Sequence, residues 1–409
     1  MADAQAAPQP DSATAPVRAV AASVVCLTAS ILPGFLTGAL GSSIKEEFGL
    51  SDRGLGLAVA LTFLLSGLAT IHAGELADRV GFRRSLVVSM GVAMAGYLWV
   101  ALLARSLATL TVGLVVAGAG LTLVGPAAKV LVADHVRAER HGIAFGVHMA
   151  GIPLAPLLAG LTVPVLGWTV PVAGWTAGWR WMFVGGATMA AVGLLMVPSE
   201  RAQAVEAPLA TAPAAGRFAH VRMPPLFVFG VAAVLASSAV TGTASFFVVA
   251  STSAGVTEDV AGLVLSAATA GVILARIALG LVADRIHDSV VATVVALLFM
   301  SAAGYLLMAG GAAWMYVLGG QAALLFGWSW PALMVVALVR MNPHAPGLAT
   351  AFIMSGLNLG AVVGPAVFGL VSDAASPSAA LVVSALGTLV AAALNVLGRL
   401  IQTRSLSPA

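Results

Sequence analysis

One arginine inside an apolar segment is the residue of this 409-residue chain whose type and position best suit ligand binding. Arg276 precedes Asp284 by eight residues, which places it about 12 Å deeper along a helix that rises about 1.5 Å per residue. A charge within a membrane segment is costly and therefore points to function. The guanidinium can bind a carboxylate through two parallel hydrogen bonds. The alternative is that Arg276 only pairs with other groups of the protein.

Two more titratable side chains lie within apolar segments. His148 can carry a proton near neutral pH, although a lone histidine in such a segment is more often a packed hydrogen-bonding residue. Lys129 lies five residues before Asp134, so its flexible chain can extend to the membrane surface. The carboxylates of the chain map to the ends of segments or to loops, and none maps near the midplane. This distribution favours a neutral or anionic ligand over a cation.

Uncharged side chains can complete a binding site near the middle of the membrane. Asn358 has an amide that needs partners there, and Trp328 and Trp330 can form an aromatic wall. Ser237 and Thr241 are further candidates. Serine and threonine in membrane helices usually bond to backbone carbonyls, so a structural role is the alternative for both.

The composition places these residues in a membrane protein. Hydrophobic residues make up 60% of the chain, charged residues only 9%, and the mean hydropathy is +1.03. Soluble domains carry about 25% charged residues. The single cysteine, Cys26, excludes a disulfide framework or a cysteine metal site. We expect no cofactor and no metal. We also expect no nucleic-acid partner, because arginines in cytoplasmic loops account for the isoelectric point of about 9.5.

Twelve segments are long and apolar enough to cross a bilayer, which takes about 20 residues each. They fall into two sets of six: 19–43, 54–77, 85–105, 108–133, 142–165 and 179–198; then 223–251, 258–283, 289–309, 313–338, 347–371 and 378–400. The resulting organisation is a disordered tail (1–18), a first six-helix bundle (19–199), a linker (200–222), a second bundle (223–402) and a short tail (403–409).

The positive charges predict the orientation. With the amino terminus inside, thirteen arginines fall on the cytoplasmic side, and only Lys45, Arg53, Arg105 and Arg180 fall outside. Cytoplasmic loops of membrane proteins are enriched in such residues. We therefore expect both termini in the cytoplasm and the protein in the cell membrane.

The two sets of segments repeat one another. The segment from Gly74 to Arg79 (GELADR) follows the second span, and the segment from Gly280 to Arg285 (GLVADR) follows the eighth. Gly56 and Gly262 also lie at matching offsets upstream of these segments.

The GELADR segment, continued through Gly81, Arg83 and Arg84, resembles the signature loop of the major facilitator superfamily. Phe82 departs from the basic residue usual there. The resemblance implies an all-α fold of two pseudo-symmetric six-helix bundles around a central cavity. It also implies a latch between the bundles, in which Asp78 lies against the start of the eleventh helix and the arginines meet an acid after span four. The residues of this expected latch are Gly74, Asp78, Arg79, Gly81, Arg83, Arg84 and Asp134, with a weaker copy at Asp284 and Arg285.

Spans five and eleven carry small residues and prolines. Residues 151–160 resemble a pattern of drug and metabolite exporters, and residues 360–369 form a small-x-x-x-small surface. Small residues allow close helix crossing, so tight packing between the bundles and a hinge are both consistent with the pattern. Leu114 stands where exporters usually have an arginine, which argues against a simple proton-antiporting drug exporter.

Residues 276–284 resemble span eight of monocarboxylate and related organic-anion transporters, where the arginine faces a carboxylate. These resemblances predict a monomeric secondary transporter, not an enzyme, that moves an anionic or neutral solute by alternating access, driven by protons, with His148 as a candidate for coupling. A drug or metabolite efflux antiporter and a non-transporting receptor remain alternatives. An intramembrane enzyme lacks a paired catalytic set at the midplane, and no nucleotide-binding G-x-x-x-x-G-K-[ST] motif is present.

Overall fold

The computed structural model describes residues 11–166, 178–198, 223–282, 289–342 and 346–404. Every regular element in these ranges is helical. The first half of the chain contains α1 (Asp11–Ala39), α2 (Gly41–Phe48), α3 (Asp52–Val80), α4 (Phe82–Leu103), α5 (Leu107–Ala119), α6 (Leu121–His135), the short helix η1 (Ala138–Arg140), α7 (His141–Met149), α8 (Gly151–Leu166) and α9 (Trp179–Met196).

The second half contains six long helices. They are α11 (Met223–Ser253), α12 (Glu258–Val282), α13 (Val290–Ala309), α14 (Ala313–Met341), α15 (Pro346–Ala374) and α16 (Pro377–Arg404). Each of the twelve expected segments overlaps one of the described helices or a consecutive pair of them.

Three boundaries differ from expectation. Helix α1 begins at Asp11, eight residues before the expected start of the first span, so the segment from Asp11 to Arg18 is helical. The fourth and fifth expected spans each consist of two consecutive helices, which meet at Gly120 and at Ala150. Glycine weakens a helix interior, and Pro153 just after the second break removes a backbone donor.

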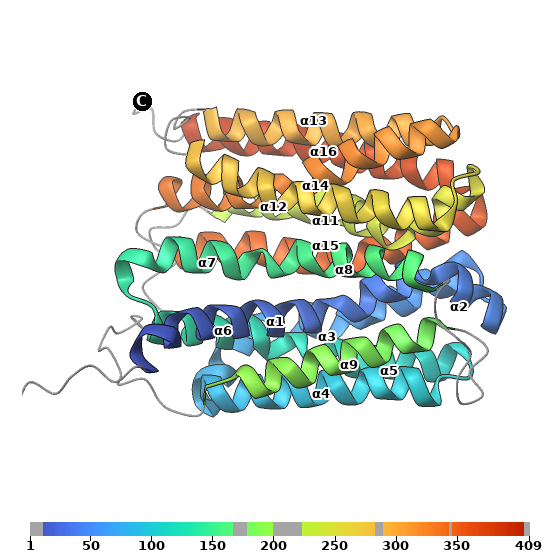
Figure 1. Ribbon diagram of the computed structural model, residues 1–409. Coiled ribbons are helices and arrows are strands. Elements are labelled where there is room, and N and C mark those ends of the chain that lie inside the picture. The colour runs from blue at the N-terminus through green and yellow to red at the C-terminus, as the bar shows by residue number, and fades with distance from the viewer. Residues whose placement is uncertain (1–10, 167–177, 199–222, 283–288, 343–345, 405–409) are drawn as a thin grey trace, which may run out of the picture.

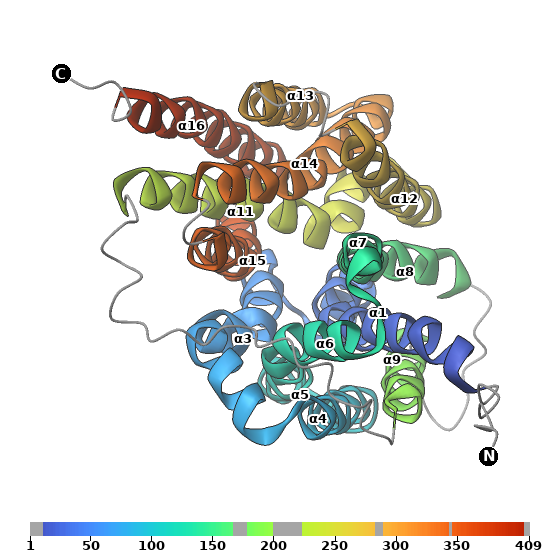
Figure 2. The same ribbon diagram turned by 90° about the vertical axis from the view of Figure 1, so that its left-hand side faces the viewer.

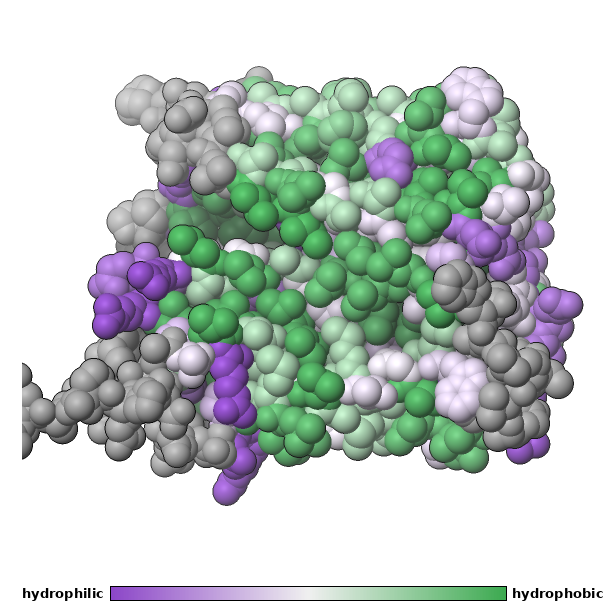
Figure 3. Space-filling view, viewed as in Figure 1, coloured by the Kyte–Doolittle hydropathy of each residue, from purple (hydrophilic) through white to green (hydrophobic). Residues whose placement is uncertain are grey.

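The described helices form a membrane domain. Eleven of them, counting α5 with α6 and α7 with α8 as one span each, are long and apolar enough to span a bilayer. The number rises to twelve if the bent pair Gly41–Phe48 and Asp52–Leu68, with 117° between the two helices, is counted as one span. Large apolar side chains face outward, with Leu195 76% and Leu274 69% exposed. Figure 3 shows this apolar surface over the middle of the molecule, with hydrophilic residues gathered mainly at its two ends. The chain is therefore a multi-pass membrane protein.

The helices run roughly parallel to one long direction (Figure 1). We name the end at which α1 begins and α16 ends the terminal end, and the opposite end the far end. Figure 2, which views the molecule from the terminal end, shows α11–α16 together in the upper part and α1–α9 in the lower part. Helices of the two halves pack against each other as α3 with α15, α8 with α12 and α1 with α11.

Glycines make these contacts between the halves close. A Cβ built on Gly160 of α8 would lie 2.5 Å from the carbonyl oxygen of Gly262 in α12, and a Cβ on Gly262 would lie 2.5 Å from that of Gly160. Gly56 of α3 meets the backbone of Pro365 and Gly369 in α15 in the same way. The small residues of spans five and eleven thus pack between the halves as expected, and their partners are the two glycines that match in the repeat.

A third close crossing and a polar contact lie near the far end. A side chain on Gly38 of α1 would overlap the backbone of Ser245 in α11. Asp52, at the start of α3, forms an ion pair with Lys45 of α2. It also accepts a hydrogen bond of 2.6 Å from the hydroxyl of Ser372 in α15. These contacts join the two halves on the far-end side of the membrane.

Candidate functional site

Arg276 lies between the two halves and is half-buried. Its Nη2 and Nε atoms donate to the carbonyl oxygen of Trp328 in α14, at 2.9 and 3.2 Å. Its Nη1 atom donates to the carbonyl oxygen of Met149, at the end of α7, at 3.3 Å. One guanidinium therefore links a helix of the second half to a helix of the first.

A proline explains why one of these carbonyls accepts a hydrogen bond from a side chain. In an α-helix the carbonyl of Met149 would accept from the backbone N–H four residues later. That residue is Pro153, which has no N–H. Arg276 thus donates to a carbonyl that lacks its helical donor in the first half, and to the carbonyl of Trp328 in the second half.

An aromatic cluster lies beside Arg276. The rings of Phe35 in α1 and Trp328 in α14 meet edge to face, with centroids 5.7 Å apart. The ring of Phe63 in α3 lies 6.0 Å from that of Phe35. All three side chains are buried, so the cluster closes the space between the halves where Arg276 holds the backbone of Trp328. Phe35 and Phe63 were not expected here, because a phenylalanine in an apolar segment carries no distinguishing sequence signal.

His148 is buried inside the first half, one residue before the carbonyl that Arg276 binds. It is 0% exposed, and within the described part of the chain neither ring nitrogen has a hydrogen-bond partner within normal limits. The imidazole lies against the backbone of Ser23 in α1, and the charge of Lys129 in α6 acts on it. The lysine is itself exposed rather than enclosed by its own bundle.

The uncharged candidates divide between the site and the helix interfaces. Trp328 lies beside Arg276, but Trp330 is buried among α11, α13 and α16 in a separate apolar core. Residues two apart on a helix point about 200° apart, so the expected wall of two tryptophans is wrong and only Trp328 belongs to it. Ser237 donates a hydrogen bond of 2.9 Å to the carbonyl of Leu357 in α15. This bond to the backbone corresponds to a structural role for Ser237 and not to a role in ligand binding.

Thr241 is buried on the same face of α11 as Ser237. Asn358 is half-buried in α15, and its backbone approaches Gly67 of α3 across the line between the halves. Asn358 therefore lies where the two halves meet.

The described part of the expected latch contains few of the expected contacts. Gly81 has a φ of +86°, the conformation for which glycine is suited. Arg79 and Arg84 are exposed. The side chain of Arg83 donates to the carbonyl of Pro198 at 3.1 Å rather than meeting Asp134.

Asp134 forms no ion pair with any side chain that the structure describes. The loop nevertheless reaches the end of α6, because the ring of Phe82 meets that of His135 edge to face at 6.2 Å. The side chains of Asp78, Asp284 and Arg285, and the surroundings of Gly74, lie outside the described residues.

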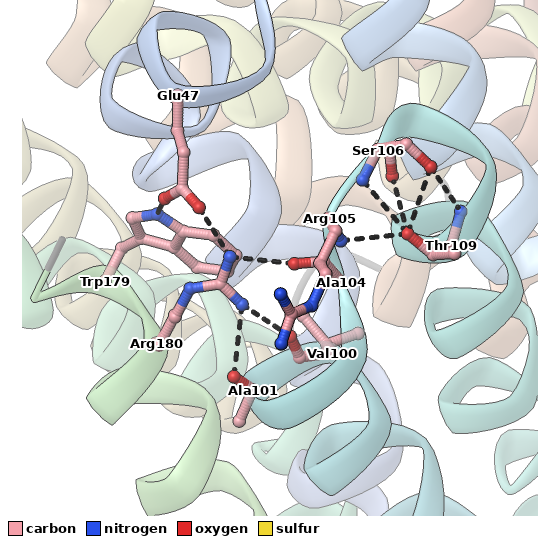
Figure 4. A network of polar contacts seen from close by, with 9 residues as sticks. All are labelled: Glu47, Val100, Ala101, Ala104, Arg105, Ser106, Thr109, Trp179 and Arg180. Carbon is pink, nitrogen blue, oxygen red and sulfur yellow. Dashed lines mark hydrogen bonds and ion pairs between the residues drawn. The ribbon is translucent and has the colours of Figure 1, made fainter. Parts of the chain in front are cut away.

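A second polar network, far from Arg276, holds the far end of the first half together (Figure 4). Arg180, which is only 8% exposed, donates to the carbonyls of Ala104 at 2.7 Å and Ala101 at 3.1 Å. It also pairs with Glu47 of α2, which accepts a hydrogen bond of 2.7 Å from the indole of Trp179.

This network satisfies carbonyls that the end of α4 leaves without intrahelical partners. Arg180 was expected only as one of the few charges on the outer side, without such a role. The acidic pair before Phe48 and the Trp-Arg pair at the start of α9 were the available signals.

The comparison with protein families assigns the chain. The model of the Major Facilitator Superfamily matches residues 19–253 and, a second time, residues 226–406. The chain belongs to this family, whose members are transporters. No curated protein sequence matches it significantly.

Solved structures share the fold at low sequence identity. A bacterial homologue of the human lysosomal transporter Spinster, in an inward-facing and unoccupied conformation, matches with a TM-score of 0.74 and 17% identity over 98% of this chain and 100% of its own. A D-xylose–proton symporter matches with a TM-score of 0.74 and 16% identity, over 93% and 97% of the two chains. These similarities support the transporter fold.

Proposed function

We propose that the chain is a secondary active transporter that moves a small organic anion by alternating access between two six-helix bundles, residues 19–199 and 223–402, joined by the linker 200–222. The double match of the family model and the paired glycine crossings support this pseudo-symmetric division into twelve spans. In it, α3 packs on α15 and α8 packs on α12. Each pair is a place where one bundle can rock against the other.

The terminal end is the cytoplasmic end of a protein in the cell membrane. Exposed arginines near this end, including Arg79, Arg83, Arg84, Arg137 and Arg140, follow the positive-inside rule. The close crossings near the far end then close the outer side, which corresponds to an inward-facing state. The loop from Gly74 to Arg84, together with Asp134, Asp284 and Arg285, serves as the cytoplasmic latch in the opposite state. The contact between Phe82 and His135 supports the placement of this loop beside α6.

The observation that carries the proposal is the pair of backbone acceptors bound by Arg276. Neutral carbonyls satisfy its hydrogen-bonding directions but leave its charge without a counterion among the described residues. A carboxylate offers both a charge and a fork-shaped acceptor. A substrate anion that reaches Arg276 therefore replaces a weak partner with a strong one, with Trp328 and Asn358 as further contacts.

Proton coupling is the second part of the proposal, with His148 as the proton carrier. His148 lies next to the residue that Arg276 binds, and α7, which carries His148, packs on α6, which carries Lys129. Like charges close together disfavour each other. An anion that binds beside both residues offsets this repulsion, so its binding favours protonation of His148 and the proton and the anion move together.

The test of anion transport is uptake into proteoliposomes by the wild type, Arg276→Ala and Arg276→Lys. We expect organic-acid uptake that Arg276→Ala abolishes. Arg276→Lys keeps the charge but not the bidentate fork, so we expect it to retain a weakened uptake. Unchanged uptake and affinity in Arg276→Ala would refute Arg276 as the anchor of the substrate.

A further inference from the structure

Lys129 is a positive charge within a span that the account of Arg276 leaves unexplained. It is one of only two lysines in a chain that otherwise uses arginine for its positive charges. The other lysine, Lys45, is paired with Asp52 at the far end. Lys129 forms no ion pair with any side chain that the structure describes. A charge in a span without a counterion is costly, so a bound anion is a reasonable partner for it.

The position of Lys129 on α6 places its side chain outside the face that packs on the rest of the first half. The buried face of α6 is formed by Val124, Ala127, Ala128, Leu131 and Val132. At about 100° per residue, Lys129 lies well outside this face, and its side chain is exposed. Helix α6 packs on α1, α3 and α4, and Figure 2 shows α4 and α5 on the side of α6 away from the second half.

Lys129 lies at nearly the depth of His148. Six residues separate Lys129 from the end of α6, and seven separate His148 from the start of α7. At about 1.5 Å per residue, both lie about 9–10 Å from the terminal ends of their helices, and Arg276 binds the carbonyl of the residue after His148.

Helix α7 connects the two cations laterally. Arg276 binds the carbonyl of Met149, at the end of α7, and α7 packs on α6, which carries Lys129. Packed helices are about 8–10 Å apart between axes, and both side chains are long and flexible.

We propose that Lys129 is a second anchor of the Arg276 site, which therefore takes an organic anion with two separate negative groups, a dicarboxylate, held between α6 and α12. This inference rests on the proposed transport of an anionic solute. Two cations on different helices select for two separated carboxylates, because a monocarboxylate leaves one cation without a partner. A single divalent group such as inorganic phosphate cannot reach both equally well.

The test is a thermal-shift titration of the purified full chain with dicarboxylates of increasing length, with monocarboxylates of matched length and with inorganic phosphate. We expect one or more dicarboxylates to bind at least about tenfold tighter than the matched monocarboxylate, since a hydrogen-bonded charge pair contributes a factor of that order. Lys129→Met should remove this preference. Lys45→Met, the matched control, should keep the preference.

A second readout uses the wild type alone. Lys129 is exposed, so an amine-reactive acylating reagent should modify it, and dicarboxylates should protect it more than monocarboxylates do. Lys129→Gln serves in the titration if Lys129→Met does not fold. A preference for dicarboxylates that survives in both variants, equal binding of the two acid classes by the wild type, or tighter binding of phosphate would overturn the inference. Organic acids that bind the wild type and Arg276→Ala with equal affinity would instead refute the proposed function itself.

Discussion

The guanidinium of Arg276 donates a hydrogen bond to the carbonyl oxygen of Met149, with 3.3 Å between the two atoms, and so links the second half of the chain to the first. Pro153 leaves that carbonyl without its usual backbone donor. The same guanidinium is the proposed anchor of the substrate. A substrate anion must therefore compete with Met149, and its binding weakens a contact that holds the two halves together.

This competition predicts that Pro153→Ala increases the affinity for the substrate anion. Alanine restores a backbone N–H for the carbonyl of Met149, so that carbonyl no longer needs Arg276. A neutral hydrogen bond contributes about 0.5–1.5 kcal/mol, so the affinity should rise by about two- to tenfold. Isothermal titration of the purified protein measures this change. Pro156→Ala is the control, since it restores a donor to Ile152, with which Arg276 makes no described hydrogen bond; an equal gain in both variants would contradict the competition.

The sequence predicted the long apolar helices well, for physical reasons. A bilayer demands long apolar helices, and their composition differs sharply from that of the loops. The repeat also identified Gly56 and Gly262 as equivalent, and both contact the opposite half. Such features depend on local composition or on residues at fixed offsets, which can be read from the sequence without the fold.

The partners of the polar side chains were harder to predict. No sequence signal places Arg180 against the carbonyls at the end of α4, because those carbonyls belong to alanine and valine. The same holds for Arg276, whose partners are the backbones of Met149 and Trp328. Trp330 was placed in the site because its side chain resembles that of Trp328, whereas the face on which it lies depends on the packing of α14.

The network around Arg180 predicts a large loss of stability on Arg180→Met. The variant leaves the carbonyls of Ala101 and Ala104 without their donor and removes the partner of Glu47. Each buried carbonyl left without a donor costs about 1–3 kcal/mol, so the Tm in detergent should fall clearly. Arg105→Met is the control, because the side chain of Arg105 is exposed and only its backbone N–H contacts Thr109. Equal Tm values for the two variants would show that Arg180 has no such role.

The bond from Ser372 to Asp52 predicts that Ser372→Ala opens the far end more often. This hydrogen bond of 2.6 Å joins α15 to α3, and its loss favours the state in which the far end is separated. A cysteine at position 245, which is buried against Gly38, in a Cys26→Ser background should react faster with a membrane-impermeant maleimide.

The matched control for this experiment is Ser384→Ala. The hydroxyl of Ser384 bonds to the carbonyl of Ala380 within α16 and joins no two helices. Labelling of position 245 should therefore be unchanged in this control. If Ser372→Ala also leaves the labelling rate unchanged, the bond to Asp52 does not hold the far end closed.

His148 provides the last prediction, because its role depends on the charge of Lys129. His148 is buried, and its helix α7 packs on α6, which carries Lys129. When an anion neutralises Lys129, His148 should take up a proton, so anion binding to the wild type in weakly buffered solution should make the medium more alkaline. His148→Gln should bind the anion without this change, and its anion uptake should no longer respond to a proton gradient. His141→Gln is the control, since the imidazole of His141 bonds to the carbonyl of Val136 near the terminal end. Proton uptake that persists in His148→Gln would assign the coupling to another group. Proton uptake that is lost in Lys129→Met as well as in His148→Gln would connect the two residues as argued.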